Sequence, residues 1–146
     1  MIDSRTAPCA ALLLRVSLGA LFLAHAAVKL FVFTPAGTAK FFGSVGMPPE
    51  LAYVVISAEV LAGVALILGV WTRVVAIAAT PILLGAIFTV HASAGFLFTN
   101  AHGGWEFPAF WIVALIVQAL LGDGIYALHL SRTDNSVGDF SDAHSH

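Results

Sequence analysis

Charged residues are scarce in this 146-residue sequence: Asp, Glu, Lys and Arg together make up 10% of it, and the formal net charge is −2. No basic stripe is present that could neutralise a phosphate backbone, which excludes nucleic acid as a partner. The single cysteine, Cys9, allows no internal disulfide, and nothing around it forms a metal or redox motif, so no metal site is expected. The sequence also lacks a nucleophile motif and a Gly-rich phosphate loop.

Hydrophobic residues, in contrast, make up 60% of the chain, far more than is usual in a soluble domain. A membrane-spanning helix needs at least about 17 to 25 apolar residues, and four stretches reach this length, at about 9–33, 50–71, 74–98 and 107–128. Turn residues separate them, so consecutive helices alternate in direction. The sequence therefore predicts an all-α membrane protein, an antiparallel four-helix transmembrane bundle formed by residues 1–128. The polar, acidic tail 129–146 is expected to be disordered.

The N-terminal segment could also be a signal peptide, because A-H-A at 24–26 imitates a small-residue cleavage site. Arg15 lies inside the would-be hydrophobic region, however, which favours a retained first span. The distribution of basic residues then predicts the orientation, since short cytoplasmic loops are rich in Lys and Arg. Lys40 lies on the side opposite to three arginines, Arg5, Arg73 and Arg132. We therefore expect a multi-pass membrane protein with both termini in the cytoplasm.

A segment of the first span is repeated in the third. L-G-A-L-F-L-A-H-A at 18–26 returns as L-G-A-I-F-T-V-H-A at 84–92, so that His25 and His91 occupy equivalent places. A fainter match, E-V-L-A-G beside Q-A-L-L-G, pairs Glu59 with Gln118. The similarity is weak enough to have arisen by chance. If it reflects a true repeat, the protein consists of two tandem helical hairpins related by a pseudo-two-fold axis along the membrane normal.

Three ionisable residues of the first span share one face of the helix. At 100° per residue, Lys29 lies between the other two around the helix axis, about 40° from His25 on one side and about 40° from Arg15 on the other. Glu59 stands near the middle of the second span. A charge at the bilayer centre costs roughly 2.5 to 3.5 kcal/mol on insertion scales, so such groups usually face the bundle interior and pair with each other. We expect Glu59 to contact Lys29 or His25.

A simpler interpretation exists for most of these residues. Lys29 and Arg15 could extend to the membrane surface, because long basic side chains reach the interface at little cost. A histidine within a helix is often only a packing group that hydrogen-bonds to another helix. Glu59 is too short to reach either surface from mid-span, so it must be paired, protonated or hydrated.

The connection before the fourth span, A-H-G-G-W-E-F-P at 101–108, offers further polar groups. His102, Trp105 and Glu106 could form a polar rim over a cavity that contains His25, Lys29, Glu59 and His91, and the alternative is an ordinary helix N-terminus. On the inner face, Asp123 could meet Arg15 or Arg73, where a structural clamp is the expected role.

These residues resemble the pattern of the DoxX family of small four-helix membrane proteins, over about residues 10–128. The resemblance is carried by Arg15, Gly19, His25, Lys29-Leu30, Phe41-Phe42, G-M-P at 46–48, Glu59, Gly63, L-G at 68–69, T-R at 72–73, G-G-W-E-F-P and G-D-G. Ala26 departs from the pattern, since the family commonly has Gly after the histidine. The resemblance implies a cytoplasmic-membrane protein linked by name to quinone-dependent oxidation of sulfur compounds.

Three functional hypotheses follow. In the first, the protein is a subunit of a membrane redox complex and binds a quinone headgroup, with His25 and Lys29 as hydrogen-bond donors and Glu59 as the proton partner. In the second, it is a non-catalytic anchor or assembly partner for another protein, or a homo-oligomer, in the lipid bilayer. In the third, His25 and His91 clamp a haem between facing helices.

Overall fold

The computed structural model describes residues 3–128, and every regular element in this part of the chain is a helix. The all-α membrane fold expected from the sequence is thereby confirmed. The tail 129–146, which the sequence predicts to be disordered, lies outside the described residues. In chain order the elements are α1 (Ala7–Ala27), the π-helix η1 (Val28–Val32), α2 (Pro35–Ser44), α3 (Leu51–Leu68), α4 (Thr72–Ala86), the π-helix η2 (Ile87–His91), the short 3-10 helix η3 (Ala92–Ala94) and α5 (Glu106–Leu121).

Three of these helical stretches are long and apolar enough to cross a membrane: Ala7–Val32 with 26 residues, Leu51–Leu68 with 18 and Thr72–Ala94 with 23. The α5 helix is equally apolar in character but has 16 residues. It ends seven residues before the boundary of 128 that hydrophobicity predicts. The reason is local, because Gly122 and Gly124 adopt positive φ angles of 83° and 70° and turn the chain away from the helix axis.

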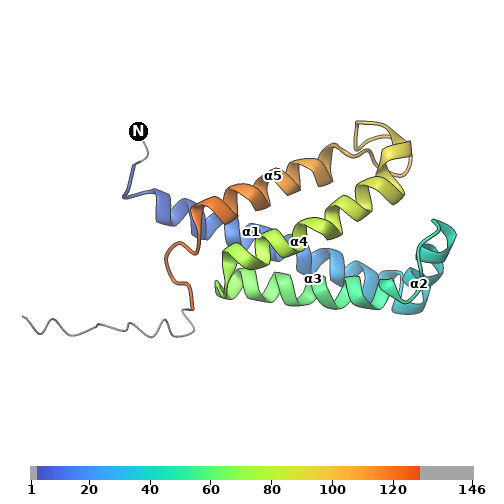
Figure 1. Cartoon of the computed structure of the whole chain (residues 1–146), viewed down its shortest axis with the longest axis horizontal. Helices are drawn as coiled ribbons and strands as arrows, with labels where there is room; N and C mark the ends of the chain where they lie inside the picture. Colours follow the sequence, from blue (N-terminus) through green and yellow to red (C-terminus); the bar gives the residue numbers. More distant parts are fainter. Residues whose placement is uncertain (1–2, 129–146) are drawn as a thin grey trace, which may run out of the picture.

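The helices pack as two antiparallel hairpins (Figure 1). α1 makes its most extensive contacts with α3, and α4 with α5, while α3–α4 and α1–α5 contacts join the pairs. This pairing gives the two hairpins that the internal repeat predicts, and the axis relating them stays a prediction. The core between the hairpins consists of Leu18, Phe22, Ala62, Leu66, Ala76, Ala79, Leu83, Trp111 and Leu115.

Two glycines allow α1 and α3 to approach closely. A Cβ atom on Gly19 would lie 2.7 Å from the backbone oxygen of Gly63, and one on Gly63 would lie 2.9 Å from the oxygen of Gly19. Real Cβ atoms do not come so near to backbone, so this contact requires glycine on both helices. The close approach sets the position of Glu59, one helical turn from Gly63, relative to α1.

The two ends of the bundle differ. At one end, which we call the terminal end, α1 begins and α5 ends (Figure 1). Gly69, with a φ of 76°, ends α3 there in a left-handed cap. At the other end, which we call the cavity end, lie α2 and the loop 95–105 (Figure 1). The α4–α5 pair diverges from α3 toward this end. The α2 helix is not anticipated by the sequence, in which residues 34–49 read as a connection. Its N-terminus is capped by the Thr34 hydroxyl, which accepts a hydrogen bond from Gly37 N at 3.2 Å.

Candidate functional site

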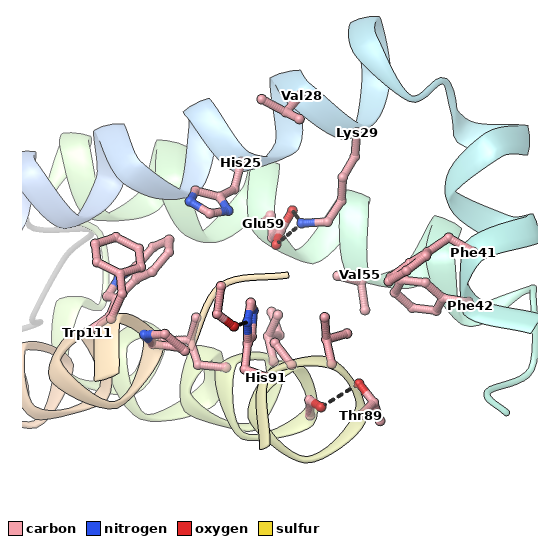
Figure 2. A pocket seen from close by; sticks show the side chains of 18 of the residues that line it. His25, Val28, Lys29, Phe41, Phe42, Val55, Glu59, Thr89, His91 and Trp111 are labelled. Atoms are coloured by element: carbon pink, nitrogen blue, oxygen red, sulfur yellow. Dashed lines mark hydrogen bonds and ion pairs between the residues drawn. The ribbon is translucent and has the colours of Figure 1, made fainter. Parts of the chain in front are cut away.

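A cavity of about 760 Å³ lies at the cavity end of the bundle. Every helical segment except the short η3 contributes to it or borders it, and most of its lining is apolar, including Val28, Phe41, Phe42, Val55 and Trp111 (Figure 2). Its ionisable side chains are few, and they are the ones that the sequence singles out: His25, Lys29, Glu59 and His91. A site of this size, apolar with a few convergent polar groups, is typical of small-molecule binding pockets.

The centre of the site is an ion pair between α3 and η1. Lys29 Nζ lies 2.6 Å from Glu59 Oε1 and 2.7 Å from Oε2, so the ammonium donates to both carboxylate oxygens (Figure 2). The Glu59 side chain is 5% exposed and that of Lys29 is 19% exposed. The contact expected from the sequence is therefore confirmed, with Lys29 as the partner rather than His25. Lys29 does not extend to the membrane surface, because its ammonium is held inside the bundle.

The backbone around Lys29 is a π-helix, the five residues Val28–Val32. π-helical segments are rare and frequently occur at functional sites, because the wider turn changes the direction in which side chains point. Thr38 of α2 is 4% exposed, and its hydroxyl lies 3.4 Å from the carbonyl oxygen of Lys29 and 3.0 Å from that of Thr34. The α2 helix thus fastens the end of the first span on which Lys29 stands.

His25 faces the aromatic side chains of α5. Its ring centroid lies 5.0 Å from that of Trp111, in an edge-on arrangement with an interplanar angle of 61°, and 6.4 Å from that of Phe107. Trp111 in turn packs against Phe22 of the core at 4.8 Å. His25 and Lys29 both line the cavity, as their shared helical face predicts. His25 therefore lies between the Lys29–Glu59 pair and the side chains of Phe107 and Trp111, which we call the aromatic wall (Figure 2).

His91 enters the cavity from η2, on the side opposite to the ion pair in Figure 2. Its Nδ1 lies 2.8 Å from the carbonyl oxygen of Gly103 in the loop 95–105. The two histidines of the repeat thus line one cavity, and they lie close enough to interact electrostatically.

The predicted polar rim is not formed as expected. His102, Trp105 and Glu106 do not line the cavity. The loop closes on itself, with Trp105 N donating to Gly95 O and Glu106 N to Phe96 O. Two of the three side chains stabilise this loop: Glu106 Oε1 accepts a hydrogen bond from Phe98 N at 2.8 Å, and the Trp105 ring packs edge-on against Phe96 with 4.8 Å between the ring centroids. His102 is exposed.

The polar residues expected on the inner face gather at the terminal end. Arg15 is 1% exposed and donates through Nη2 to the carbonyl oxygens of Ile125 and Tyr126, each at 3.4 Å. Asp123 lies close enough to act on Arg15 electrostatically, which agrees with the clamp that the sequence predicts. Two further contacts in this region are the approach of the Arg73 guanidinium to Gly122, and the 2.8 Å hydrogen bond from Gln118 Nε2 to Gly122 O.

Sequence reasoning missed the aromatic wall. Phe107 and Trp111 are four residues apart on α5 and face His25, and this helical spacing was a usable signal. Phe42 and Met47 line the cavity from α2 and the turn after it, and they could not be assigned while α2 itself was unrecognised. Among residues 3–128, no group of three or more His, Cys, Asp or Glu side chains is arranged to hold a metal ion.

Comparison with known proteins places the chain in a family. The sequence profile of DoxX matches residues 10–92, which run from α1 to the first residue of η3 and contain all four ionisable residues of the cavity. A Bacillus subtilis (strain 168) protein named "Putative oxidoreductase CatD" is 38% identical over 117 residues, covering 80% of this chain and 82% of that protein. No solved structure matches the chain. With its long apolar helices, the chain is a multi-pass membrane protein and belongs to the DoxX family.

Proposed function

We propose that this protein is a subunit of a membrane redox complex and that its cavity binds the headgroup of a quinone. The observation that carries the proposal is the Lys29–Glu59 ion pair inside a largely apolar cavity of about 760 Å³. Charged groups within membrane spans are costly and mark substrate or proton pathways. The family relative that carries an oxidoreductase name supports a redox role.

The lining fits the chemistry of a quinone. The ring is flat and apolar and would lie against the aromatic side chains Phe107 and Trp111, while each of its carbonyl oxygens accepts hydrogen bonds. An ammonium has three N–H donors, and Lys29 uses two of them on Glu59, so one remains for a carbonyl oxygen. His25, beside the same aromatic wall, supplies a second donor when its ring nitrogen is protonated.

Bound quinone supplies two-electron, two-proton redox chemistry. The role of this chain is to bind the headgroup and to handle protons. Glu59 is the group suited to exchange protons, because it is linked to Lys29 by two short, charge-assisted hydrogen bonds and faces the cavity. Lys29, His25 and Glu59 are the residues on which we expect activity to depend.

The proposal places the protein in the cytoplasmic membrane, with both termini in the cytoplasm. The distribution of basic residues supports this orientation: Arg5 and Arg73 stand at the terminal end, whereas Lys40 stands on α2 at the cavity end. Arg132, which contributes to the same bias, lies outside the described residues. The cavity then lies in the outer half of the bilayer.

Quenching of tryptophan fluorescence by decylubiquinone, in detergent micelles, tests the proposal. Trp111 lines the cavity, so we expect saturable quenching in the wild type. Exchange of Lys29 for Met should raise the Kd about three- to tenfold through loss of one hydrogen bond. Exchange of the exposed Lys40 for Met is the matched control and should leave the Kd unchanged.

Two other results would reject the proposal in favour of one of the alternatives. Equal, non-saturable quenching in the wild type and both variants would leave the non-catalytic anchor as the better description. A Soret absorption band in the purified protein, lost on exchange of either His25 or His91, would identify a haem in place of the quinone.

A further inference from the structure

The hydrogen bond between His91 and the loop fixes which ring nitrogen carries the proton. A backbone carbonyl only accepts hydrogen bonds, so the contact of 2.8 Å between His91 Nδ1 and Gly103 O requires the hydrogen to be on Nδ1. In the neutral imidazole, Nε2 then carries a lone pair and is an acceptor. His91 lines the cavity, and its ring rises from η2 toward the space below His25 and Glu59 in Figure 2.

The loop holds the Gly103 carbonyl in place. Gly103 has a φ of 71°, a conformation that L side chains rarely adopt. A Cβ on Gly104 would overlap the backbone of Phe96 and Leu97. The amide nitrogen of Gly104 also donates a hydrogen bond to the carbonyl oxygen of Leu97 at 3.0 Å. This tight closure makes Gly103 O a fixed acceptor, and so the orientation of the His91 ring is fixed as well.

Most of the other polar groups of the cavity are already hydrogen-bonded to one another or to the backbone. The Lys29 ammonium is a donor only, and both oxygens of Glu59 already accept from it. Thr89 donates its hydroxyl hydrogen to the carbonyl oxygen of Gly85 at 2.8 Å. His91 Nε2 is thus an acceptor whose protonation is fixed by a backbone contact, and the His91 side chain lies across the cavity from that of a donor, Lys29 (Figure 2).

We propose that His91 makes the cavity selective for the reduced ligand, a hydroquinone, over the oxidised quinone. A hydroquinone carries O–H groups, one of which donates to His91 Nε2 while the other oxygen accepts from Lys29. A quinone has carbonyl oxygens only, and two acceptors facing each other form no hydrogen bond, so the Nε2 lone pair would be desolvated without compensation. This inference rests on the proposed function and adds to it the redox form that the site prefers.

The test compares the affinities of decylubiquinol and decylubiquinone, each measured by tryptophan quenching under anaerobic conditions. In the variant His91→Asn, the side-chain amide can still donate to Gly103 O, but the acceptor at the Nε2 position is lost. We expect the wild type to prefer the quinol, and the variant to lose about three- to tenfold of that preference. Quinol binding should weaken because its acceptor is gone, and quinone binding should be no weaker than in the wild type because the unpaired Nε2 lone pair is gone as well. His102→Asn, a histidine outside the cavity in the same loop, should retain the wild-type ratio.

An unchanged quinol-to-quinone ratio in His91→Asn would overturn the inference while leaving the proposed function intact. If the wild type bound neither form, the proposed function would fail and this inference with it. Nitrogen NMR of histidine-labelled wild type gives a test that needs no variant: the protein should show His91 protonated at Nδ1, and quinol, but not quinone, should shift its Nε2 resonance. A His91 protonated only at Nε2 would contradict the inference.

Discussion

Removal of one partner of the Lys29–Glu59 pair should destabilise the protein far more than removal of both. The pair is enclosed, with side-chain exposures of 19% and 5%, and its two contacts are 2.6 and 2.7 Å long. A buried charge that loses its partner costs about 3 to 5 kcal/mol, whereas replacement of both charges by apolar side chains of similar volume is often neutral or stabilising. Because Lys29 keeps some exposure to the cavity, we expect Glu59→Leu and Lys29→Met each to cost about 3 kcal/mol.

The assay is a double-mutant cycle, read as the free energy of unfolding in mixed detergent micelles by circular dichroism. The double variant Lys29→Met/Glu59→Leu should unfold within about 1 kcal/mol of the wild type. Lys40→Met and Glu50→Leu form the matched control, because both residues are exposed and outside the cavity, and their effects should be small and additive. The reasoning is refuted if the single Lys29 and Glu59 variants are as stable as the wild type, or if the double variant shows the sum of their losses.

Two further predictions concern the bundle and its orientation. Gly63→Ala should destabilise the protein by about 1 to 3 kcal/mol, because the new methyl group would meet Leu23 and the backbone of Gly19. Gly85→Ala is the control and should not destabilise it, because an added Cβ there meets no atom of another element within 4 Å. Equal thermal midpoints for the two variants would show that the α1–α3 contact is looser than described. For the orientation, a membrane-impermeant maleimide applied to intact cells should label a Lys40→Cys variant in a Cys9→Ser background and should not label the native Cys9. The reverse labelling would place the termini outside.

The sequence was sufficient for the main helices and for the pairing of Glu59 with a polar group of the first span. Four apolar stretches gave α1, α3, α4 and α5, since only helices satisfy the backbone within such lengths of hydrophobic chain. That Glu59 contacts Lys29 or His25 followed from the cost of an unpaired carboxylate deep in a span, and the structure identifies Lys29 as the partner. Both inferences depend on local composition and depth, which a sequence records directly.

The remaining features depend on backbone geometry that composition does not reveal. Residues 125–128 are largely apolar and extend the predicted fourth span, but Gly122 and Gly124 turn the chain back, so that Ile125 N reaches Pro8 O and Leu128 N reaches Leu68 O. Pro35 and Gly37 made α2 read as a loop, although proline is well tolerated in the first turn of a helix. The sequence carries no signal for the two π-helices, and the bond between His91 and Gly103 depends on how the loop 95–105 folds back. For this reason the orientation of Lys29 and His91 in the cavity was beyond sequence reasoning.

The central claim, that the cavity around Lys29 and Glu59 holds a quinone, is tested most directly by native mass spectrometry of gently purified protein together with lipid extraction. We predict that quinone travels with the wild type and with Lys40→Met, and that it is depleted in the stable double variant Lys29→Met/Glu59→Leu while bound phospholipid is retained. Phospholipid alone on the wild type, or equal amounts of quinone on the wild type and the double variant, would contradict the claim.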